Sequence, residues 1–136
     1  MEEPHRLKRV VWIGSSRRDL KSFPDDVKRA IGVPLYQAQL GAKAPSAKPL
    51  SGFRSAGVLE IVADYYSDTY RVVYTVRFGD FIYVLHAFQK KSKRGDTIPK
   101  HDVALIRSRL ESAQEDYRYR DRLNEKKYSQ RGGSQT

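Results

Sequence analysis

Apolar residues alternate with polar ones along three consecutive stretches in the middle of the chain. These stretches are rich in β-branched and aromatic residues, as strands are: residues 58–66 (VLEIVADYY), 69–78 (TYRVVYTVRF) and 81–88 (FIYVLHAF). The pairs Ser67-Asp68 and Gly79-Asp80 separate them. Because connections this short join antiparallel neighbours, the three stretches are predicted to form a three-stranded meander.

The segment before the meander is predicted to hold one strand and two helices. They cover residues 8–13, about 16–23 and 24–41. Gly32 and Pro34 interrupt the apolar repeat of the second helix. A proline in a helix interior costs about 3 kcal/mol, so a kink or break is predicted near 32–34.

The remaining segments are a loop and a final helix. Residues 42–57 are rich in Pro, Gly, Ser and Ala, which predicts a loop, with Leu50 and Phe53 packing it onto the core. Pro99 begins a helix that is expected to run to about residue 120. Its apolar stripe is predicted to comprise Val103, Ile106, Leu110, Ala113 and Tyr117. The basic residues Lys100, Arg107, Arg109 and Arg118 are expected to point mostly elsewhere.

The composition favours a single basic domain. A chain of 136 residues can bury one core, so residues 1–120 are predicted to form one domain. Residues 121–136 contain too little apolar surface to pack and are predicted to be a disordered basic tail. The formal net charge is +10, with 26 Lys and Arg against 16 Asp and Glu. An excess of this size suggests a polyanionic partner, such as nucleic acid or an acidic protein.

The chain lacks the residues that several classes of chemistry require. The chain has no cysteine, which excludes disulfides, cysteine-ligated zinc and thiol catalysis. Its three histidines are widely separated, and no Gly-rich phosphate loop or serine nucleophile elbow is present, so no metal or other cofactor is expected. With no signal peptide and no apolar run long enough to span a bilayer, we expect a soluble, cytoplasmic protein without a membrane partner.

One arginine occupies an unusual position on the central strand. Side chains alternate along a strand, so Arg71 shares a face with Val73 and Thr75, while the more apolar face is expected to pack against the helices. An unpaired charge there is costly. Either Arg71 forms a structural ion pair with Asp64 or Asp68, or it contacts an anionic ligand.

The last strand of the meander leads directly into a cluster of cations. Lys90, Lys91, Lys93 and Arg94 follow it, and they can approach the same edge of the sheet as Arg71, near Tyr74, Tyr83 and His86. Cations beside aromatic rings suit phosphate contacts and base stacking. The alternative is a solvated strand end, with His86 as a core residue on the face of Val84 and Phe88.

Four motifs together carry a resemblance. They are KPLSGF (48–53), GVLEI (57–61), DTYRVVY (68–74) and VLHAFQKKSK (84–93). Taken in this order, they resemble the RelE/HigB-type toxins of type II toxin–antitoxin systems, in particular the phage-derived HigB-like branch. The resemblance extends over about residues 9–118. It implies an α/β (α+β) RelE-like fold, in which an antiparallel sheet carries two N-terminal helices on one face and is followed by a C-terminal helix.

The resemblance also implies an activity and partners. Such toxins are metal-independent endoribonucleases that cleave mRNA on the translating ribosome, through attack of a 2′-hydroxyl on the adjacent phosphate. The implied partners are the ribosome, mRNA and a cognate antitoxin, expected to be a small helix-turn-helix protein encoded adjacently. Operator DNA is expected to be bound only by the toxin–antitoxin complex.

Site residues follow residue by residue from the same resemblance. Arg71 matches the arginine of the YR strand and would clamp phosphate, and Lys90 and Lys91 match the cations that stabilise the transition state. His86 would act as general base or would hold the strand end. As further RNA contacts we add Lys93, Arg94, Lys48, Arg54 and Tyr74.

Two other functions remain open from the sequence. Relatives often carry a cation on the first strand of the meander, where this chain has Val62. That difference favours a non-catalytic RNA- or ribosome-binding protein of the same fold. A phage-derived accessory protein is the third possibility.

Overall fold

The structure is a computed structural model that describes residues 6–53, 56–90 and 98–133, with residues 128–133 described by their backbone alone. The described part of the chain forms five strands and three helices. In chain order they are β1 (Arg9–Trp12), α1 (Ser16–Lys21), α2 (Asp25–Gln39), β2 (Ala47–Pro49), β3 (Val58–Tyr65), β4 (Asp68–Thr75), β5 (Phe81–Lys90) and α3 (Lys100–Gly133). The predicted α/β (α+β) class is confirmed.

All five strands lie in one sheet, in the order β1-β5-β4-β3-β2. The three-stranded meander is confirmed, because β3, β4 and β5 pair antiparallel. Its first turn lies one residue earlier than predicted, at Tyr66-Ser67, where Tyr66 adopts a positive φ of 55°.

The first strand pairs differently from the prediction. β1 runs parallel to β5, with Arg9 opposite Phe81, so the sheet is mixed and the prediction of a purely antiparallel sheet was wrong for this strand. A parallel pair needs a long connection, and here the chain passes through two helices and three strands between the partners. Periodicity within β1 carries no information about its partner.

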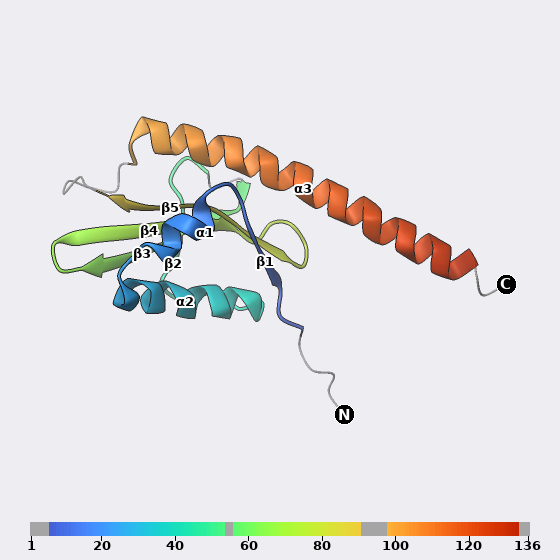
Figure 1. Ribbon diagram of the computed structural model, residues 1–136, viewed down its shortest axis with the longest axis horizontal. Coiled ribbons are helices and arrows are strands. Elements are labelled where there is room, and N and C mark those ends of the chain that lie inside the picture. Colours follow the sequence, from blue (N-terminus) through green and yellow to red (C-terminus); the bar gives the residue numbers. More distant parts are fainter. Residues whose placement is uncertain (1–5, 54–55, 91–97, 134–136) are drawn as a thin grey trace, which may run out of the picture.

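Helices cover both faces of the sheet (Figure 1). Below the sheet in that view, Val27 and Ile31 of α2 belong to one buried cluster with Val72 and Tyr74 of β4, and Leu20 of α1 packs against it. Above it, α3 packs against the opposite face. The predicted stripe is confirmed there: Ile106 and Ala113 are fully buried, and Val103, Leu110 and Tyr117 pack around them. The two N-terminal helices therefore share one face, as expected.

The predicted break in the second helix does not occur. α2 continues through Gly32 and Pro34 to Gln39. Pro34 is buried with Ile31 and Leu35 on the core side of the helix. Packing of that apolar side offsets the hydrogen bond that the proline cannot donate.

One strand was missed within the predicted loop. Ala47–Pro49 forms β2 at the edge of the sheet, paired with β3. A segment of three residues ending in proline gives no alternating pattern, and an edge position tolerates a proline because one side of the strand needs no partner. Leu50 and Phe53 are buried, which confirms that they pack this region onto the core.

The final helix is much longer than predicted. α3 extends beyond residue 120 to Gly133, so most of the segment 121–136, for which we expected disorder, is helical. Five of the six residues 122–127 are Arg, Leu, Glu or Lys, which have high helix propensity, and they continue a helix already nucleated on the sheet. The expectation of disorder considered only packing. Within the described residues, no helix has the length and apolar character needed to cross a membrane.

Candidate functional site: a polar band under the C-terminal helix

Five polar side chains gather on the sheet face that α3 covers. The register places Lys48 opposite Glu60, Glu60 opposite Val73, and Val73 opposite His86. Arg71 on β4 lies two residues from Val73, and Lys90 on β5 lies four residues from His86, so both side chains share this face. We call Lys48, Glu60, Arg71, His86 and Lys90 the polar band. The predicted candidates Arg71, His86 and Lys90 are thus brought to one face.

A bulge in β5 determines which way His86 points. Val73 pairs with His86 and Tyr74 pairs with Val84, so Leu85 is the extra residue. Val84 packs in the cluster under α2, whereas Leu85 packs under α3, together with Phe88. His86 therefore shares a face with Phe88, as predicted, but not with Val84. The prediction assumed strict alternation, which a bulge interrupts.

Arg71 forms a buried ion pair. Its Nη1 lies 2.8 Å from Oε2 of Glu60, and the two side chains are only 4% and 9% exposed. Glu60 is the diagonal neighbour of Arg71 across the pair β3–β4, within reach of a long side chain. The ion-pair alternative was correct in kind, but the expected partners were wrong. Asp64 instead accepts a hydrogen bond from Thr69.

The cations of the band differ in exposure. Lys90 ends β5 opposite Thr69, diagonal to Arg71, and is buried. Lys48 is exposed on the edge strand β2, opposite Glu60. Four further candidates lie outside the described residues: Arg54, Lys91, Lys93 and Arg94.

Tyr74 does not belong to this site. It lies on the opposite face of β4, fully buried in the cluster that packs under α2. Burial raises the pKa of Tyr74 to about 12. The expectation that Tyr74 would lie beside the cations was wrong, since the pleat of β4 separates it from Arg71 and Val73.

Both ring nitrogens of His86 have partners. Nε2 lies 2.8 Å from Oδ1 of Asp102, and Nδ1 lies 3.3 Å from Nη1 of Arg109. An arginine only donates hydrogen bonds, so Nδ1 is the acceptor and Nε2–H donates to the carboxylate. The ring also stacks on Phe88, with centroids 4.6 Å apart. Of the two roles open for His86, the geometry favours holding the strand end, because no ring nitrogen is left to accept a proton from a substrate.

Arg109 connects three elements through one guanidinium group. Besides His86, it donates to the carbonyl oxygen of Leu85 in the bulge (2.9 Å) and to Oγ of Ser15 (3.0 Å). Ser15 in turn donates to Asp19 of α1. Gly14, with a φ of +58°, makes room: a Cβ there would lie 2.8 Å from Nε of Arg109.

Asp102 and Arg109 were not predicted as site residues. We expected the side chain of Arg109 to point away from the core, yet it extends from α3 to β5, where it reaches the carbonyl oxygen of Leu85. The signal was present in the helical spacing, since Asp102 and Arg109 flank the fully buried Ile106 at four and three residues, on the same side of the helix. This spacing could be interpreted as part of a site only with the knowledge that His86 of β5 faces these two residues.

Acid is expected to destabilise the protein through His86. Burial lowers the pKa of His86, and the neighbouring Asp102 opposes this shift only in part. The unfolded chain, in which histidine titrates near 6.5, therefore binds this proton more readily than the folded protein. The stabilising contribution is complete above pH 6.5 and declines below it, by at most about 1.4 kcal/mol per pH unit.

Urea unfolding of wild type and His86→Gln, between about pH 7.5 and 5.5, measures this contribution. The stability advantage of wild type should shrink as the pH falls. His101→Gln is the control, because His101 is 82% exposed although it lies 3.6 Å from the same carboxylate. An advantage that stays constant across this range would contradict the expectation.

Most of the chain matches a known protein family. A family model described as "Phage derived protein Gp49-like" matches residues 18–111, from α1 to about one third of the way along α3. The chain belongs to this family. For the Gp49-like chain, the phage-derived part of the expected resemblance is thereby confirmed, and the match includes every residue of the polar band.

Two further comparisons add less about the Gp49-like chain. Among curated proteins, none matches it. Among solved structures, it is similar to a chain in the crystal structure of the toxin–antitoxin complex RelBE2 from Mycobacterium tuberculosis. That match has 18% identity and a TM-score of 0.43, and it covers 67% of this chain and 100% of the other. Within the described residues of the Gp49-like chain, no three His, Asp or Glu side chains gather as metal ligands would.

Proposed function

We propose that this Gp49-like protein is the toxin of a type II toxin–antitoxin system, and that it is a ribosome-dependent mRNA endoribonuclease that inhibits translation. The observation that carries the proposal is the placement of Arg71 and Lys90 as diagonal neighbours on one face, at one end of the sheet. Two cations side by side suit a phosphodiester whose negative charge increases during cleavage. The net charge of +10 supports an RNA substrate.

The reaction is a metal-independent transesterification. The 2′-hydroxyl of one nucleotide gives its proton to solvent water and attacks the adjacent phosphorus. The bond from phosphorus to the 5′-oxygen of the next nucleotide breaks, and a cyclic phosphate remains. The leaving oxygen takes up a proton, which an ammonium group such as that of Lys90 can supply. Arg71 and Lys90, with Lys91 by the family resemblance, stabilise the phosphorane. His86 positions the end of β5 through Asp102 and Arg109.

The proposed partners follow from the same assignment. A toxin of this kind acts in the cytoplasm on ribosome-bound mRNA and is held inactive by an antitoxin, which we expect to be a small helix-turn-helix protein encoded next to it. The toxin–antitoxin complex, rather than the toxin alone, would bind operator DNA. Lys48, exposed at the edge of the polar band, would meet RNA first.

One observation favours a second candidate. Arg71 is buried and paired with Glu60, and a carboxylate next to the proposed phosphate position opposes anion binding. Val62, opposite Arg71 on β3, supplies no further cation. A non-catalytic protein that binds RNA or the ribosome through exposed cations such as Lys48 would retain this arrangement.

Mapping of transcript 5′ ends in cells induced to express the protein distinguishes the two. Wild type should generate new 5′ ends within coding regions, and Lys90→Gln should reduce their number at least tenfold, about 1.4 kcal/mol of lost transition-state stabilisation. Lys100→Gln, which removes an exposed lysine at the start of α3, should cleave as wild type does.

The thermal midpoint of Lys90→Gln, measured on the purified protein, separates lost chemistry from lost folding. Lys90→Arg should restore part of the cleavage, because it keeps the charge. Growth arrest with intact transcripts in the wild-type cells would refute the nuclease and support the non-catalytic alternative.

A further inference from the structure

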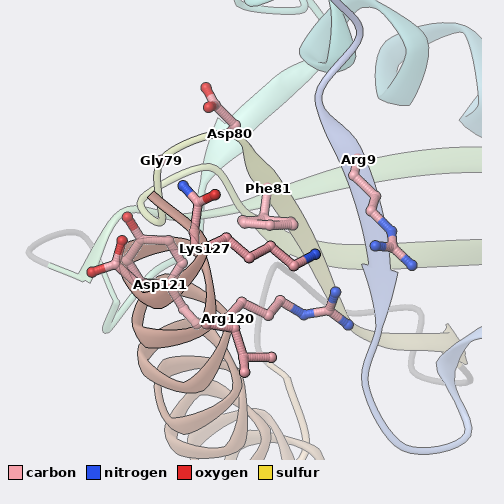
Figure 2. Close-up of a pocket in the computed structure, with 10 residues that line it drawn as sticks. Arg9, Gly79, Asp80, Phe81, Arg120, Asp121 and Lys127 are labelled. Atoms are coloured by element: carbon pink, nitrogen blue, oxygen red, sulfur yellow. The ribbon is translucent and has the colours of Figure 1, made fainter. Parts of the chain in front are cut away.

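A second cationic hollow lies at the other end of β5, away from the polar band. A cavity of about 550 Å³ opens between the C-terminal half of α3, the start of β1 and the turn before β5. Figure 2 shows its lining residues, among them Arg9, Phe81, Arg120 and Lys127. Phe81 is the first residue of β5 and Lys90 the last. At about 3.3 Å per residue, roughly 30 Å separates the two sites.

The sequence of α3 explains why this cavity is open. The helix side that faces the sheet carries Ile106 and Ala113, both fully buried, and then Tyr117. At the next positions on the same side stand Arg120, Asn124 and Lys127. The helix therefore continues past the core with polar residues where apolar ones would close the gap. The family model ends at residue 111, so the family match does not account for this extension.

Three cations converge in the cavity. The register places Arg9 beside Phe81 on the face that α3 covers. In Figure 2 the charged groups of Arg9, Arg120 and Lys127 point into the same space, whereas the carboxylates of Asp80 and Asp121 point away from it. Like charges brought together in this way favour a ligand that carries negative charge.

Arg120 is held in place rather than free in solvent. Its Nε lies 2.6 Å from Oδ2 of Asp116, and its guanidinium carbon lies 5.4 Å from the ring centroid of Phe81. Asp116 also accepts a hydrogen bond from the hydroxyl of Tyr83, whose pKa is raised mainly by burial and also by this carboxylate. Phe81 and Tyr117 pack edge to face, with centroids 6.1 Å apart. The cavity thus combines an oriented guanidinium with aromatic rings.

We propose that this cavity binds single-stranded RNA, with a phosphate among Arg9, Arg120 and Lys127 and a base against the guanidinium and ring surface at Phe81. Cations along a concave surface with aromatic or guanidinium planes are the elements that single-stranded RNA binders use. An acidic peptide would pair with the cations but would leave the rings without a partner. The site shares its class of ligand with the proposed function, but it depends on other residues.

Fluorescence anisotropy with a short labelled single-stranded RNA and the purified full chain tests the site. Arg9→Gln/Lys127→Gln should weaken binding about tenfold. It should also lower the slope of log affinity against log salt by up to about 0.7, the contribution of one neutralised phosphate of single-stranded RNA. Both side chains are exposed, so the thermal midpoint should stay that of wild type.

Arg122→Gln/Lys126→Gln is the matched control. It removes one arginine and one lysine from exposed positions of α3 that do not line this cavity. Equal weakening by the two double variants would mean that net charge alone attracts RNA and would overturn the proposal. Undiminished RNA binding by Arg9→Gln/Lys127→Gln would overturn it too. So would displacement of the RNA from this site by poly-glutamate added at an equal concentration of negative charge. Because the assay needs no cleavage, its outcome is separate from that of the transcript mapping.

Discussion

Replacing Arg71 with alanine is expected to lower the free energy of unfolding by about 3–5 kcal/mol. The substitution leaves the carboxylate of Glu60 buried without its cation, since the two side chains are 4% and 9% exposed and lie 2.8 Å apart. The cost arises from desolvating a charge that has lost its partner. Urea unfolding followed by circular dichroism measures it.

An exposed ion pair provides the control for this prediction. Arg29 and Asp26 lie 2.6 Å apart on α2 with side chains 75% and 70% exposed. Arg29→Ala should cost less than about 1 kcal/mol, because water screens the pair and solvates the remaining carboxylate. Comparable losses in the two variants would show that Glu60 is solvated in the folded protein and would contradict the expectation.

The same pair provides a functional test that avoids unfolding. Glu60→Leu/Arg71→Met replaces both charges with apolar side chains, an exchange that is often neutral or stabilising at buried ion pairs. If Arg71 stabilises the cleavage transition state, this double variant should fold as wild type does and yet produce no new transcript ends. Wild-type cleavage by the double variant would assign Arg71 a purely structural role.

Replacing Arg109 with leucine is expected to lower the free energy of unfolding by about 2–3 kcal/mol. Leucine keeps part of the packing but removes the donors to the carbonyl of Leu85, to His86 and to Ser15. The carbonyl of Leu85 is the most costly loss, since it belongs to a fully buried residue in a bulge. Thermal and urea unfolding should show the effect.

The matched control is Arg118→Leu, on the same helix but exposed. Its stability should stay within about 0.5 kcal/mol of wild type. If Arg109→Leu is as stable as this control, the guanidinium does not hold the bulge. In that case the orientation of His86 must come from Asp102 and Phe88 alone.

The elements that depend on residues close together in the sequence were predicted correctly. The meander, the two N-terminal helices and the apolar stripe of α3 follow from alternation, helical repeats and short turns. The parallel partner of β1 and the three-residue strand β2 depend on residues distant in sequence, so no window of the chain could indicate them. The helical continuation beyond residue 120 was missed because low apolar content was taken to mean disorder.

The candidate site was predicted in part. The alternation of β4 correctly gave Arg71 a buried position that demands a partner, but strand register decides that the partner is Glu60 rather than Asp64. The bulge at Leu85 carries no sequence signal here, and it alone separates His86 from Val84. Tyr74 was expected near the cations although alternation along β4 already places it on the opposite face from Arg71, and the structure keeps it there.

The pairing of β1 with β5 also affects how the chain folds. The register joins Arg9 to Phe81, 72 residues further along the chain, while the meander consists of neighbours in sequence. Closing so long a loop costs chain entropy before any contact compensates it, and folds with such distant contacts form slowly. Until β1 docks, the outer backbone edge of β5 remains available to other strands. During synthesis the first strand to leave the ribosome must therefore wait for the last strand before it can pair.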